Sequence, residues 1–478
     1  MSVEPLWRSG AMAAAMRAVV QGSLPEAITG LSIDSRTVAP GEAYFAIKGD
    51  VHDGHAFVEA ALKAGAALAV VETAQAASFA GAPLLVVDDV LAGLVELAHA
   101  ARARLNGQVI AVTGSVGKTS TKEALLHVLG AQGKTHASTA SFNNHWGVPL
   151  SLARCPADAK FAIAEVGMNH AGEIRALVRM VRPHVAIITT VEPVHLEFFT
   201  GIEAIADAKA EIFESLESNG SVVLNRDNAQ FGRLQARARE LGISRIVSFG
   251  ADKASDARLV DLSLHATCSA VHADILGREV TYKLGMPGRH MAMNSLAVLA
   301  ASALVGADLA RAALSLSQIG PAAGRGVRRR LDVSSGEAIL IDESYNANPA
   351  SMAAALNVLG QAPVGPRGRR IAMLGDMLEL GPSGPALHGG LIEAIKANRI
   401  DLVYCCGPLM RNLWDALSTG KRGGYAESAA ALETQAVAAI RAGDAIMVKG
   451  SLGSKMKTIV NALEKRFPGK AALDDAAV

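Results

Sequence analysis

The sequence predicts an α/β fold of three domains: a small N-terminal α/β domain, a central P-loop domain with a mainly parallel sheet, and a C-terminal Rossmann-like domain. Three observations predict this class. The chain has 478 residues, and a domain usually takes roughly 150. Apolar strand-like runs alternate with helix-like segments, which is typical of parallel, doubly wound sheets. A glycine-containing loop joins one strand to a helix. We expect the domains to span residues 1–89, 90–320 and 321–478.

The composition excludes several classes of protein. Hydrophobic residues make up 50% of the chain and charged residues 19%, as in a globular protein and unlike a disordered or fibrous one. The 46 Lys and Arg nearly cancel the 45 Asp and Glu, so the net charge does not favour nucleic acid or an anionic membrane as a partner. An anion bound by this protein must therefore be held by a local site.

The four cysteines, Cys155, Cys268, Cys405 and Cys406, form neither a CxxC pair nor a metal-ligand pattern. We expect them to be buried, reduced thiols on strands of a cytoplasmic protein. Charged residues interrupt every N-terminal apolar stretch before a signal-peptide core can form, and the longest apolar run, residues 296–307, is too short to span a membrane. We expect neither secretion nor membrane insertion.

The elements follow in order along the chain. In the first domain the pattern predicts strands over residues 43–47, 67–72 and 83–87 and a helix over 54–65. In the second it predicts strands over 108–112, 161–166, 185–191 and 221–225, and helices over 90–105, 119–129, 173–181 and 202–216. Beyond a loop over 320–330, it predicts strands over 338–342, 370–374, 401–405 and 444–448, and helices over 349–359, 386–396, 429–441 and 454–467. The tail after Pro468 lacks periodicity, and we expect it to fray.

The sharpest motif is residues 110–120, where a buried strand breaks into a loop with two glycines and then opens a helix. Gly114 and Gly117 let successive backbone N–H groups face inward, where the helix N-terminus adds partial positive charge. Lys118 can reach the phosphates of a nucleotide, and Thr119 can ligate Mg²⁺. The strict P-loop has a further glycine five positions before Gly117, so this is a shortened variant. The alternative is an ordinary strand-to-helix turn with a solvated lysine.

Magnesium also needs ligands from neighbouring strand ends. Glu165 ends the strand predicted over 161–166, and His195 lies just past the strand predicted over 185–191. In a parallel sheet both emerge at the same edge as the loop, which makes them candidate metal ligands. For Lys209, the spacing alone predicts a solvent-exposed helix lysine.

Several segments together resemble the Mur ligase family, and the resemblance spans essentially the whole chain. They are Asp34-Ser35-Arg36, Pro40-Gly41-Glu42 and residues 49–57 in the first domain, residues 113–120 and 141–149 in the second, and residues 342–349, 375–381 and Lys449-Gly450-Ser451 in the third. Members of this family join a UDP-muramoyl-peptide carboxylate to an amine, with ATP converting the carboxylate to an acyl phosphate. The resemblance therefore implies an ATP-dependent amide ligase that uses ATP and Mg²⁺.

The resemblance also implies roles for individual residues. It makes Lys118, Lys209 and His195 catalytic, and Thr119, Glu165, His195 and Lys209 metal ligands; Lys209 matches a lysine that several members carry as a carbamate. The implied ATP-binding residues are Thr113, Gly114, Ser115, Val116, Gly117, Lys118, Thr119, Ser120, Asn294, Arg325 and Asp342. The implied substrate-binding residues are Asp34, Ser35, Arg36, Asp53, Gly54, His55, Asn143, Asn144, Tyr345, Asn346 and Asn348. Without the family, the segments around Asp34 and Asp53 are typical of turns.

By the same resemblance, the third-domain segment 342–348 implies an acceptor of dipeptide type. The family member that adds the third amino acid of the peptide carries an Asp-Asn-Pro-Arg motif, and this motif does not occur here. The resemblance thus implies ligation of D-alanyl-D-alanine to UDP-N-acetylmuramoyl-tripeptide, giving the pentapeptide precursor of peptidoglycan, by a monomer with no nucleic-acid or membrane partner. One departure is His145-Trp146, where the family pattern has Glu or His followed by an aliphatic residue.

Three other functions fit parts of the sequence. The chain could be an amide ligase for another substrate, such as a folylpolyglutamate synthase, but its separate N-terminal domain of uridine-recognition type disfavours this. It could be a P-loop protein that uses ATP only as a conformational switch. The polar loop over residues 344–348 disfavours this, because a switch does not need such a loop. A nucleotide-sugar binding protein without chemistry would leave the P-loop idle.

Overall fold

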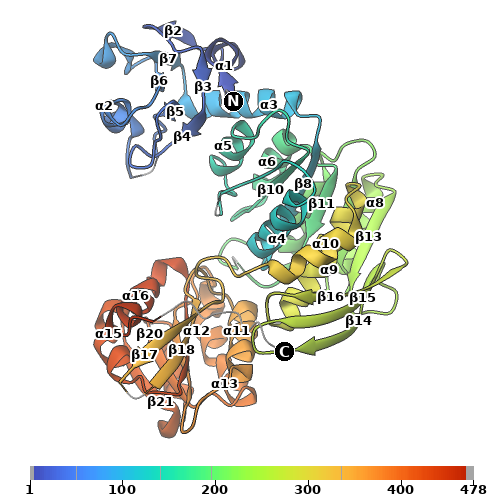
Figure 1. Cartoon of the computed structure of the whole chain (residues 1–478), viewed down its shortest axis with the longest axis vertical. Coiled ribbons are helices and arrows are strands. Elements are labelled where there is room, and N and C mark those ends of the chain that lie inside the picture. Colours follow the sequence, from blue (N-terminus) through green and yellow to red (C-terminus); the bar gives the residue numbers. More distant parts are fainter. Residues whose placement is uncertain (1–4, 50, 140, 195, 335, 470–478) are drawn as a thin grey trace.

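The computed structural model describes residues 5–49, 51–139, 141–194, 196–334 and 336–469. The chain forms three bodies along a C-shaped course: the N-terminal body at the top of Figure 1, the central body on the right and the C-terminal body at the lower left. Most of the tail predicted to fray, residues 470–478, lies outside the described residues. The three-domain α/β prediction is confirmed.

The N-terminal body is built on a five-stranded sheet in the order β2-β7-β6-β5-β4, parallel except for the edge strand β2. Its elements are β1 Trp7–Arg8, α1 Ser9–Met16, β2 Val19–Gln21, β3 Ala27–Ile28, β4 Gly30–Ser32, β5 Glu42–Phe45, α2 Val58–Lys63, β6 Leu68–Glu72 and β7 Leu84–Val87. The three predicted strands are present. The helix predicted over 54–65 begins as a 3₁₀ turn, Gly54–Phe57, and continues as α2.

A long helix, α3 (Val90–Arg104), joins the first two bodies and contributes to both cores. Leu94 and Leu97 are buried with the N-terminal sheet, whereas Ala98 is buried with the central sheet. The indole Nε1 of Trp7 also donates a 2.8 Å hydrogen bond to the carbonyl of Ala153 in the central body. The first two bodies are therefore joined by a shared helix and by side-chain contacts as well as by the chain.

The central body has a nine-stranded sheet in the order β16-β15-β14-β13-β12-β11-β8-β10-β9. Its strands are β8 Gln108–Thr113, β9 Thr135–Ala137, β10 Phe161–Glu165, β11 Val185–Ile188, β12 Ser221–Asn225, β13 Arg245–Gly250, β14 Ala257–Leu264, β15 Ser269–Ile275 and β16 Arg278–Leu284. Its helices are α4 Lys118–Gly130, α5 Gly147–Ala153, α6 Glu173–Val181, α7 Ile202–Ala210, α8 Phe231–Glu240, α9 Arg289–Leu304 and α10 Leu309–Ser315. The sheet is parallel from β9 to β14, and β15 and β16 continue it with antiparallel pairing. The sequence analysis did not predict β14, β15 or β16.

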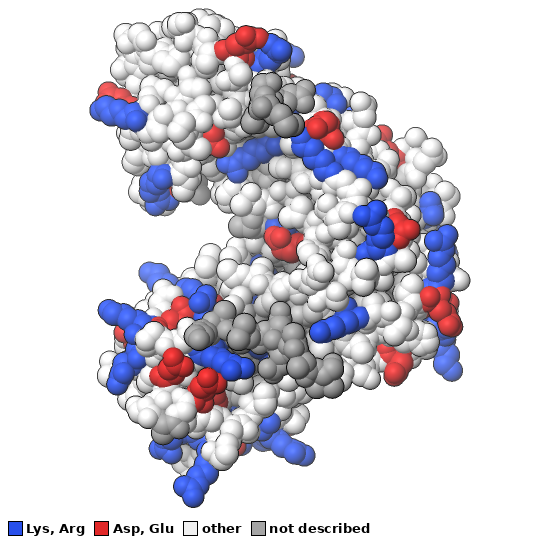
Figure 2. Space-filling view, in the orientation of Figure 1, with Lys and Arg blue, Asp and Glu red and all other residues white. Residues whose placement is uncertain are grey.

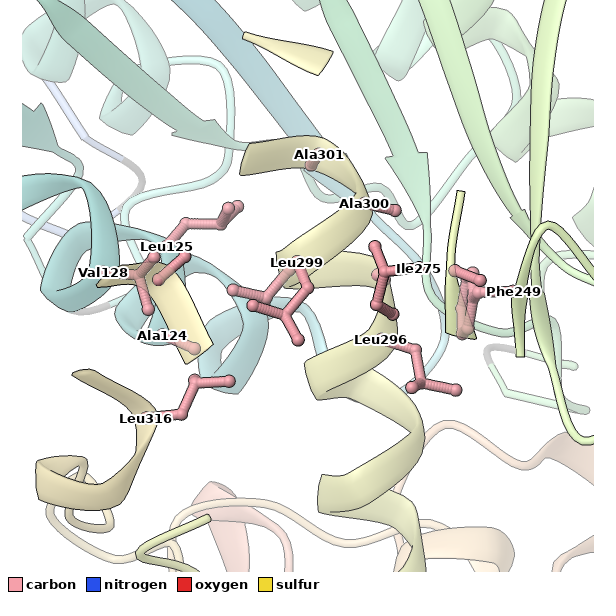
Figure 3. Close-up of a cluster of buried hydrophobic side chains, with 14 of the residues drawn as sticks. Ala124, Leu125, Val128, Phe249, Ile275, Leu296, Leu299, Ala300, Ala301 and Leu316 are labelled. Carbon is pink, nitrogen blue, oxygen red and sulfur yellow. The ribbon is translucent and has the colours of Figure 1, made fainter. Parts of the chain in front are cut away.

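The core of the central body centres on α9, which is apolar on most of its faces (Figure 3). Leu296 and Leu299 pack within one buried cluster with Val128 of α4 and Ile275 of β15. A helix covered on several sides needs this unusual apolar content, which explains the long apolar run over residues 296–307. In the described part of the chain, no helix is long and apolar enough to cross a membrane.

The C-terminal body has a six-stranded sheet in the order β17-β18-β22-β19-β20-β21, parallel except for β17. Its strands are β17 Val327–Val333, β18 Gly336–Glu343, β19 Arg370–Gly375, β20 Leu402–Cys406, β21 Arg422–Ala426 and β22 Ala445–Lys449. Its helices are α11 Pro349–Gln361, α12 Gly384–Gly389, α13 Leu391–Ala397, α14 Arg411–Ala416, α15 Ala429–Ala438 and α16 Lys457–Arg466.

Two predictions for this body need correction. The loop predicted over 320–330 ends earlier, because Val327 already begins β17 and pairs with Asp342 of β18. The helix predicted over 386–396 is divided into α12 and α13 at Gly390.

The cysteines also differ in part from expectation. All four are free thiols, and burial raises the pKa of Cys405 to about 12. Cys405 and Cys406 lie buried on β20, as predicted. Cys155 is buried but follows α5, and Cys268 is half-buried in the turn before β15, so these two are not on strands.

Replacing Leu299 by Ala should lower the free energy of unfolding by about 2 to 5 kcal/mol, because a fully buried side chain leaves a cavity that its neighbours fill only in part. Urea unfolding followed by far-UV circular dichroism measures this. Leu314→Ala on the neighbouring α10 is the matched control, since Leu314 is 74% exposed and should change stability by no more than about 0.5 kcal/mol. Equal effects of the two substitutions would contradict the packing of α9.

Candidate active site

The turn from β8 into α4 adopts a backbone that requires glycine at two positions. Gly114 has φ 149°, and a Cβ there would lie 2.0 Å from Oγ1 of Thr189. Gly117 has φ 90°, and a Cβ there would lie 2.8 Å from Nδ2 of Asn294. Both positions thus combine a left-handed backbone with a neighbour that leaves no room for a side chain. The N-terminus of the 13-residue helix α4 follows directly, as in an anion-binding loop.

A cavity of about 390 Å³ opens over this loop, between the central and C-terminal bodies. The ammonium of Lys118 lines it and donates a 2.7 Å hydrogen bond back to the carbonyl of Gly114. Most of the predicted nucleotide and metal residues line the cavity: Ser115, Val116, Gly117, Lys118, Thr119, Ser120, Glu165, Asn294 and Arg325. Four of the predicted substrate residues line it too: Asn143, Tyr345, Asn346 and Asn348. Thr113 does not line the cavity: it is fully buried, and its carbonyl accepts a hydrogen bond from Oγ1 of Thr189 at 3.3 Å.

Glu165 ends β10 beside the loop and has one carboxylate oxygen to spare. Its Oε1 accepts hydrogen bonds from Oγ1 of Thr119 at 3.2 Å and from Nδ2 of Asn143 at 2.8 Å. The side chain is only 1% exposed, and Oε2 has no hydrogen-bond partner among the described residues. A buried carboxylate oxygen without a donor suits a cation, so these residues fit Mg²⁺. The predicted ligand His195 lies outside the described residues.

Magnesium at this site would rely on the nucleotide as well as on the protein. The described part of the chain contains no cluster of three or more His, Cys, Asp or Glu side chains able to hold a metal. Mg²⁺ usually binds through one or two carboxylates together with substrate phosphates. The single carboxylate Glu165, next to the hydroxyl of Thr119, agrees with this kind of site.

Lys209 is buried near the end of α7, which corrects the solvent-exposed position that its spacing predicted. Burial, and then the nearby charge of Lys118, hold the pKa of Lys209 well below its usual range. No hydrogen bond or ion pair joins its ammonium to another described residue. A buried amine next to a second cation is costly when charged, so its neutral form is favoured here.

Arg325 reaches the cavity from the C-terminal side. Its guanidinium lies 4.4 Å from the ring centroid of Tyr345, and Nη2 is 3.4 Å from Oγ of Ser141 in the central body. Asp342, in contrast, is turned away from the cavity: its carboxylate accepts from Lys457 at 2.7 Å and from Oγ of Ser344 at 2.6 Å. Its predicted contact with ATP stays a prediction.

The predicted substrate residues of the N-terminal body lie apart from this cavity. Asp34 pairs with Arg36 at 2.7 Å on the surface, and that partner lowers the pKa of Asp34 to about 2. Asp53 accepts hydrogen bonds from the backbone and ring of His55, whose Nε2 accepts from the backbone of Glu72 at 3.0 Å. His55 is therefore held in place by the fold. Figure 2 shows a deep hollow between the N-terminal and C-terminal bodies, with the central body on its right side.

Asn144 has a local role, since its Oδ1 accepts from the backbone N–H of Gly147 at the start of α5. Near it, the departure His145-Trp146 places the ring of Trp146 edge-on to Phe142, with 5.2 Å between ring centroids.

The sequence analysis missed several residues that line the cavity. Lys449, at the end of β22, is buried and donates to the carbonyl of Asn346 at 2.9 Å and to Glu343 at 3.3 Å. Its position directly after a predicted strand was the available signal. Thr190 and Glu192 follow β11, and Asn225 is the last residue of β12, at the same sheet edge. Nothing in the local sequence distinguishes these three from ordinary residues at strand ends.

The fold and the site define a class of protein: a three-domain P-loop enzyme with its nucleotide cavity between the second and third domains. The Mur ligase family catalytic domain matches residues 27–106, the Mur ligase middle domain residues 112–302, and the Mur ligase glutamate ligase domain residues 329–452. The chain belongs to the Mur ligase family, and so is an ATP-dependent ligase that forms an amide bond.

Similar proteins cover nearly the whole chain. Two curated relatives are named UDP-N-acetylmuramoyl-tripeptide–D-alanyl-D-alanine ligase. The one from Rickettsia prowazekii is 31% identical over 95% of this chain and 99% of its own length. The one from Escherichia coli is 33% identical, over 91% and 93%. A crystal structure of MurF from Acinetobacter baumannii has a TM-score of 0.83 and 27% identity, and covers 97% of this chain and 100% of its own.

Replacing Lys118 by Ala should reduce turnover about a hundredfold or more while the fold survives. The side chain lines the cavity, and its loss removes a preorganised cation that we expect to lie next to the phosphoryl group during transfer. Steady-state assays, with circular dichroism to check folding, measure this. Lys134→Ala removes an exposed lysine of the same body and should leave turnover unchanged. A Lys118→Ala enzyme with near-normal turnover would show that the loop has another role.

Proposed function

We propose that this chain joins D-alanyl-D-alanine to UDP-N-acetylmuramoyl-tripeptide, with ATP hydrolysed to ADP and phosphate, and so forms the pentapeptide precursor of peptidoglycan. The observation that carries the proposal is the shared cavity. A P-loop lysine, Lys118, and residues of a polar third-domain loop, Tyr345 and Asn346, line the same space. The names of the full-length relatives supply the substrates.

The reaction needs the carboxylate to be activated. Hydroxide is a poor leaving group, so the γ-phosphoryl group passes to the peptide carboxylate first. The amine then attacks the acyl carbon, and phosphate leaves as the amide forms. Phosphoryl transfer asks the protein for positioning and charge neutralisation. Lys118, the N-terminus of α4 and Arg325 provide both around the cavity.

Mg²⁺ would be held by Thr119 and Glu165 together with the phosphates of ATP, and His195 is a further proposed ligand. When bound, the ion neutralises charge on the phosphate oxygens. Asn143 orients the carboxylate of Glu165: its side-chain amide donates a hydrogen bond to Oε1, which leaves Oε2 for the ion.

Lys209 is proposed to act as a carbamate. The neutral amine attacks CO₂, a C–N bond forms as one C=O π bond opens, and one proton leaves the nitrogen, which converts a neutral group into an anion. The lowered pKa of Lys209 favours the neutral amine that this step requires. The product removes the repulsion between Lys209 and Lys118 and offers oxygen ligands to a second Mg²⁺.

The two ends of the UDP-muramoyl substrate are proposed to lie far apart. Asp34 and Asp53 both exert charge on Tyr44, so the proposed uridine-recognition segments are neighbours in the N-terminal body. From there the peptide would cross the hollow of Figure 2 to the cavity.

We further propose domains of 1–89, 90–320 and 321–478, since each sheet falls within one of these spans. We also propose that the protein is a monomer in the cytoplasm.

Phosphate release tests the function directly. The chain should release phosphate from ATP when UDP-N-acetylmuramoyl-tripeptide and D-alanyl-D-alanine are both present, and mass spectrometry should find the pentapeptide product. Turnover with a folate and glutamate in their place, or ATP hydrolysis that neither substrate changes, would favour the alternatives.

Replacing Lys209 by Ala should leave the enzyme nearly inactive, and short-chain carboxylic acids should restore part of the activity. The added carboxylate replaces the missing anion in the space that the buried side chain vacates. Activity against formate or acetate concentration measures the rescue. An experimental structure with bound ATP and metal that shows an unmodified Lys209 would refute the carbamate.

Binding of ATP and the UDP-tripeptide together should reduce the radius of gyration measured by small-angle scattering. The reacting atoms must approach to roughly 3 Å, although their binding residues come from separate bodies. Gly324 and Gly326, with φ 69° and 97° in the segment before β17, suit a hinge. Arg325→Ala should weaken this compaction, whereas Arg329→Ala, which removes an exposed partner of Glu464, should not. An unchanged profile on saturation would rule out this closure.

A further inference from the structure

Ser141 lines the nucleotide cavity, although it is not among the residues that the family resemblance assigns to a site. Its hydroxyl lies between two residues from different bodies. It is 3.4 Å from Oγ1 of Thr119 on α4 and 3.4 Å from Nη2 of Arg325, which belongs to the C-terminal body. Thr119 in turn contacts Glu165, at the site that fits Mg²⁺. Ser141 therefore stands between the proposed closure residue and the metal site.

The hydrogen-bond donors in this group of side chains all point the same way. A guanidinium has no acceptor, so Arg325 must donate to the hydroxyl of Ser141. The single proton of the Thr119 hydroxyl goes to Oε1 of Glu165, at 3.2 Å. In the contact between Ser141 and Thr119 it is therefore Ser141 that donates. A directed chain of hydrogen bonds thus runs from Arg325 through Ser141 and Thr119 to Glu165.

This chain of hydrogen bonds leaves two oxygen acceptors free at the metal site. The hydroxyl of Thr119 has two lone pairs, and the proton of Ser141 takes only one of them. Oε1 of Glu165 accepts from Thr119 and from Asn143, whereas Oε2 has no partner among the described residues. Oxygen ligands of this kind suit Mg²⁺. The chain therefore determines which oxygens are available to the ion.

The loop that carries Ser141 is anchored to the two elements that carry the metal residues. At its start, the carbonyl of Ser138 accepts a 2.7 Å hydrogen bond from Nζ of Lys122 on α4. At its end, the carbonyl of Asn143 accepts from the N–H of Gly167, two residues after β10, at 2.8 Å. Because both anchors belong to the elements of the metal site, the loop holds the hydroxyl of Ser141 in a defined place beside it.

Arg325, in contrast, is placed by the C-terminal body. Its guanidinium lies 4.4 Å from the ring centroid of Tyr345, and the chain turns just before it at Gly324, where φ is 69°. Both contacts of Ser141, at 3.4 Å, are longer than the roughly 2.5–3.2 Å that is usual for such hydrogen bonds. They can therefore shorten when the C-terminal body moves closer to the central one.

We propose that Ser141 is a positioning residue that couples closure of the C-terminal body to metal binding. When Arg325 approaches, it occupies the acceptor side of the Ser141 hydroxyl, whose proton then points at Thr119. Hydrogen bonds in such a chain reinforce one another, so Thr119 and Glu165 are held with their free oxygens ready for Mg²⁺. Coupling is reciprocal, so closure is in turn favoured when the metal site is filled. The inference rests on the ATP- and Mg²⁺-dependent reaction proposed above and adds a residue to it.

Ser141→Ala removes the link, whereas Ser141→Thr keeps a hydroxyl at the same place. Electron paramagnetic resonance measures the affinity for Mn²⁺, which takes oxygen ligands as Mg²⁺ does, at saturating ADP. Ser141→Ala should weaken Mn²⁺ binding about threefold to tenfold, as expected for the loss of one or two hydrogen bonds. Ser141→Thr should stay within twofold of the unmodified chain. So should the matched control Ser138→Ala, because that hydroxyl is buried at the start of the same loop and has no hydrogen-bond partner among the described residues.

A double-mutant cycle separates this coupling from a purely structural role. Arg325→Ala should weaken Mn²⁺ binding at least threefold more in the unmodified chain than in Ser141→Ala. Equal effects of Arg325→Ala in the two backgrounds overturn the proposal, as does Mn²⁺ binding within twofold of normal in Ser141→Ala. So does a loss in Ser141→Thr or Ser138→Ala that equals the loss in Ser141→Ala. Circular dichroism checks folding, and Ser141→Gly decides in the same way if Ser141→Ala does not fold.

The ligase function is judged by a separate measurement. Mn²⁺ binding needs neither the UDP-tripeptide nor the dipeptide, so it decides on Ser141 whether or not the chain forms the pentapeptide. Failure of the unmodified chain to form the pentapeptide would overturn the proposed function and leave the result for Ser141 as measured.

Discussion

The turn between β8 and α4 is the constraint on which the site depends. A buried strand has to become a helix within four residues while its backbone N–H groups stay available to an anion. Two other elements fix this turn from outside: Thr189 after β11 packs on Gly114, and Asn294 of α9 packs on Gly117. Because α9 is itself held by the central core around Leu299, the packing of that core sets the shape of the loop. Stability and nucleotide binding therefore rest on the same helix.

The cavity also stores unbalanced charge. Burial lowers the pKa of Lys118 and Lys449, which line the cavity, and the nearby charge of Arg325 lowers both further. Glu165 and Glu343 offset only part of this, since their charges act on Lys118 and Lys449 respectively. Holding cations partly out of water is unfavourable until an anion arrives. A triphosphate provides that anion, so the cations are already placed where charge develops in the reaction.

Much of the fold and part of the site could be predicted because the signals are local. The P-loop is readable since an apolar strand, two glycines and Lys118 follow one another in the chain. The burial of Lys209 could not be predicted from the sequence, because it arises from packing between α7 and distant parts of the central body. The strands β14 to β16 were not predicted, because apolar and polar residues alternate along these half-exposed strands and form no apolar run. The ring of His55 hydrogen-bonds to Asp53 and to the backbone of Glu72 within the fold, and its contact with substrate stays a prediction.

The three bodies are joined with unequal strength, and this decides where motion can occur. The first and second share α3 and the contact between Trp7 and Ala153, so they resist relative movement. The second and third are joined by the segment before β17 and meet around cavities. Ligands that fill these cavities contact both bodies at once, so their binding stabilises the closed form of the joint. The energy of substrate binding is thus coupled to closure at the one joint where phosphate, carboxylate and amine have to meet.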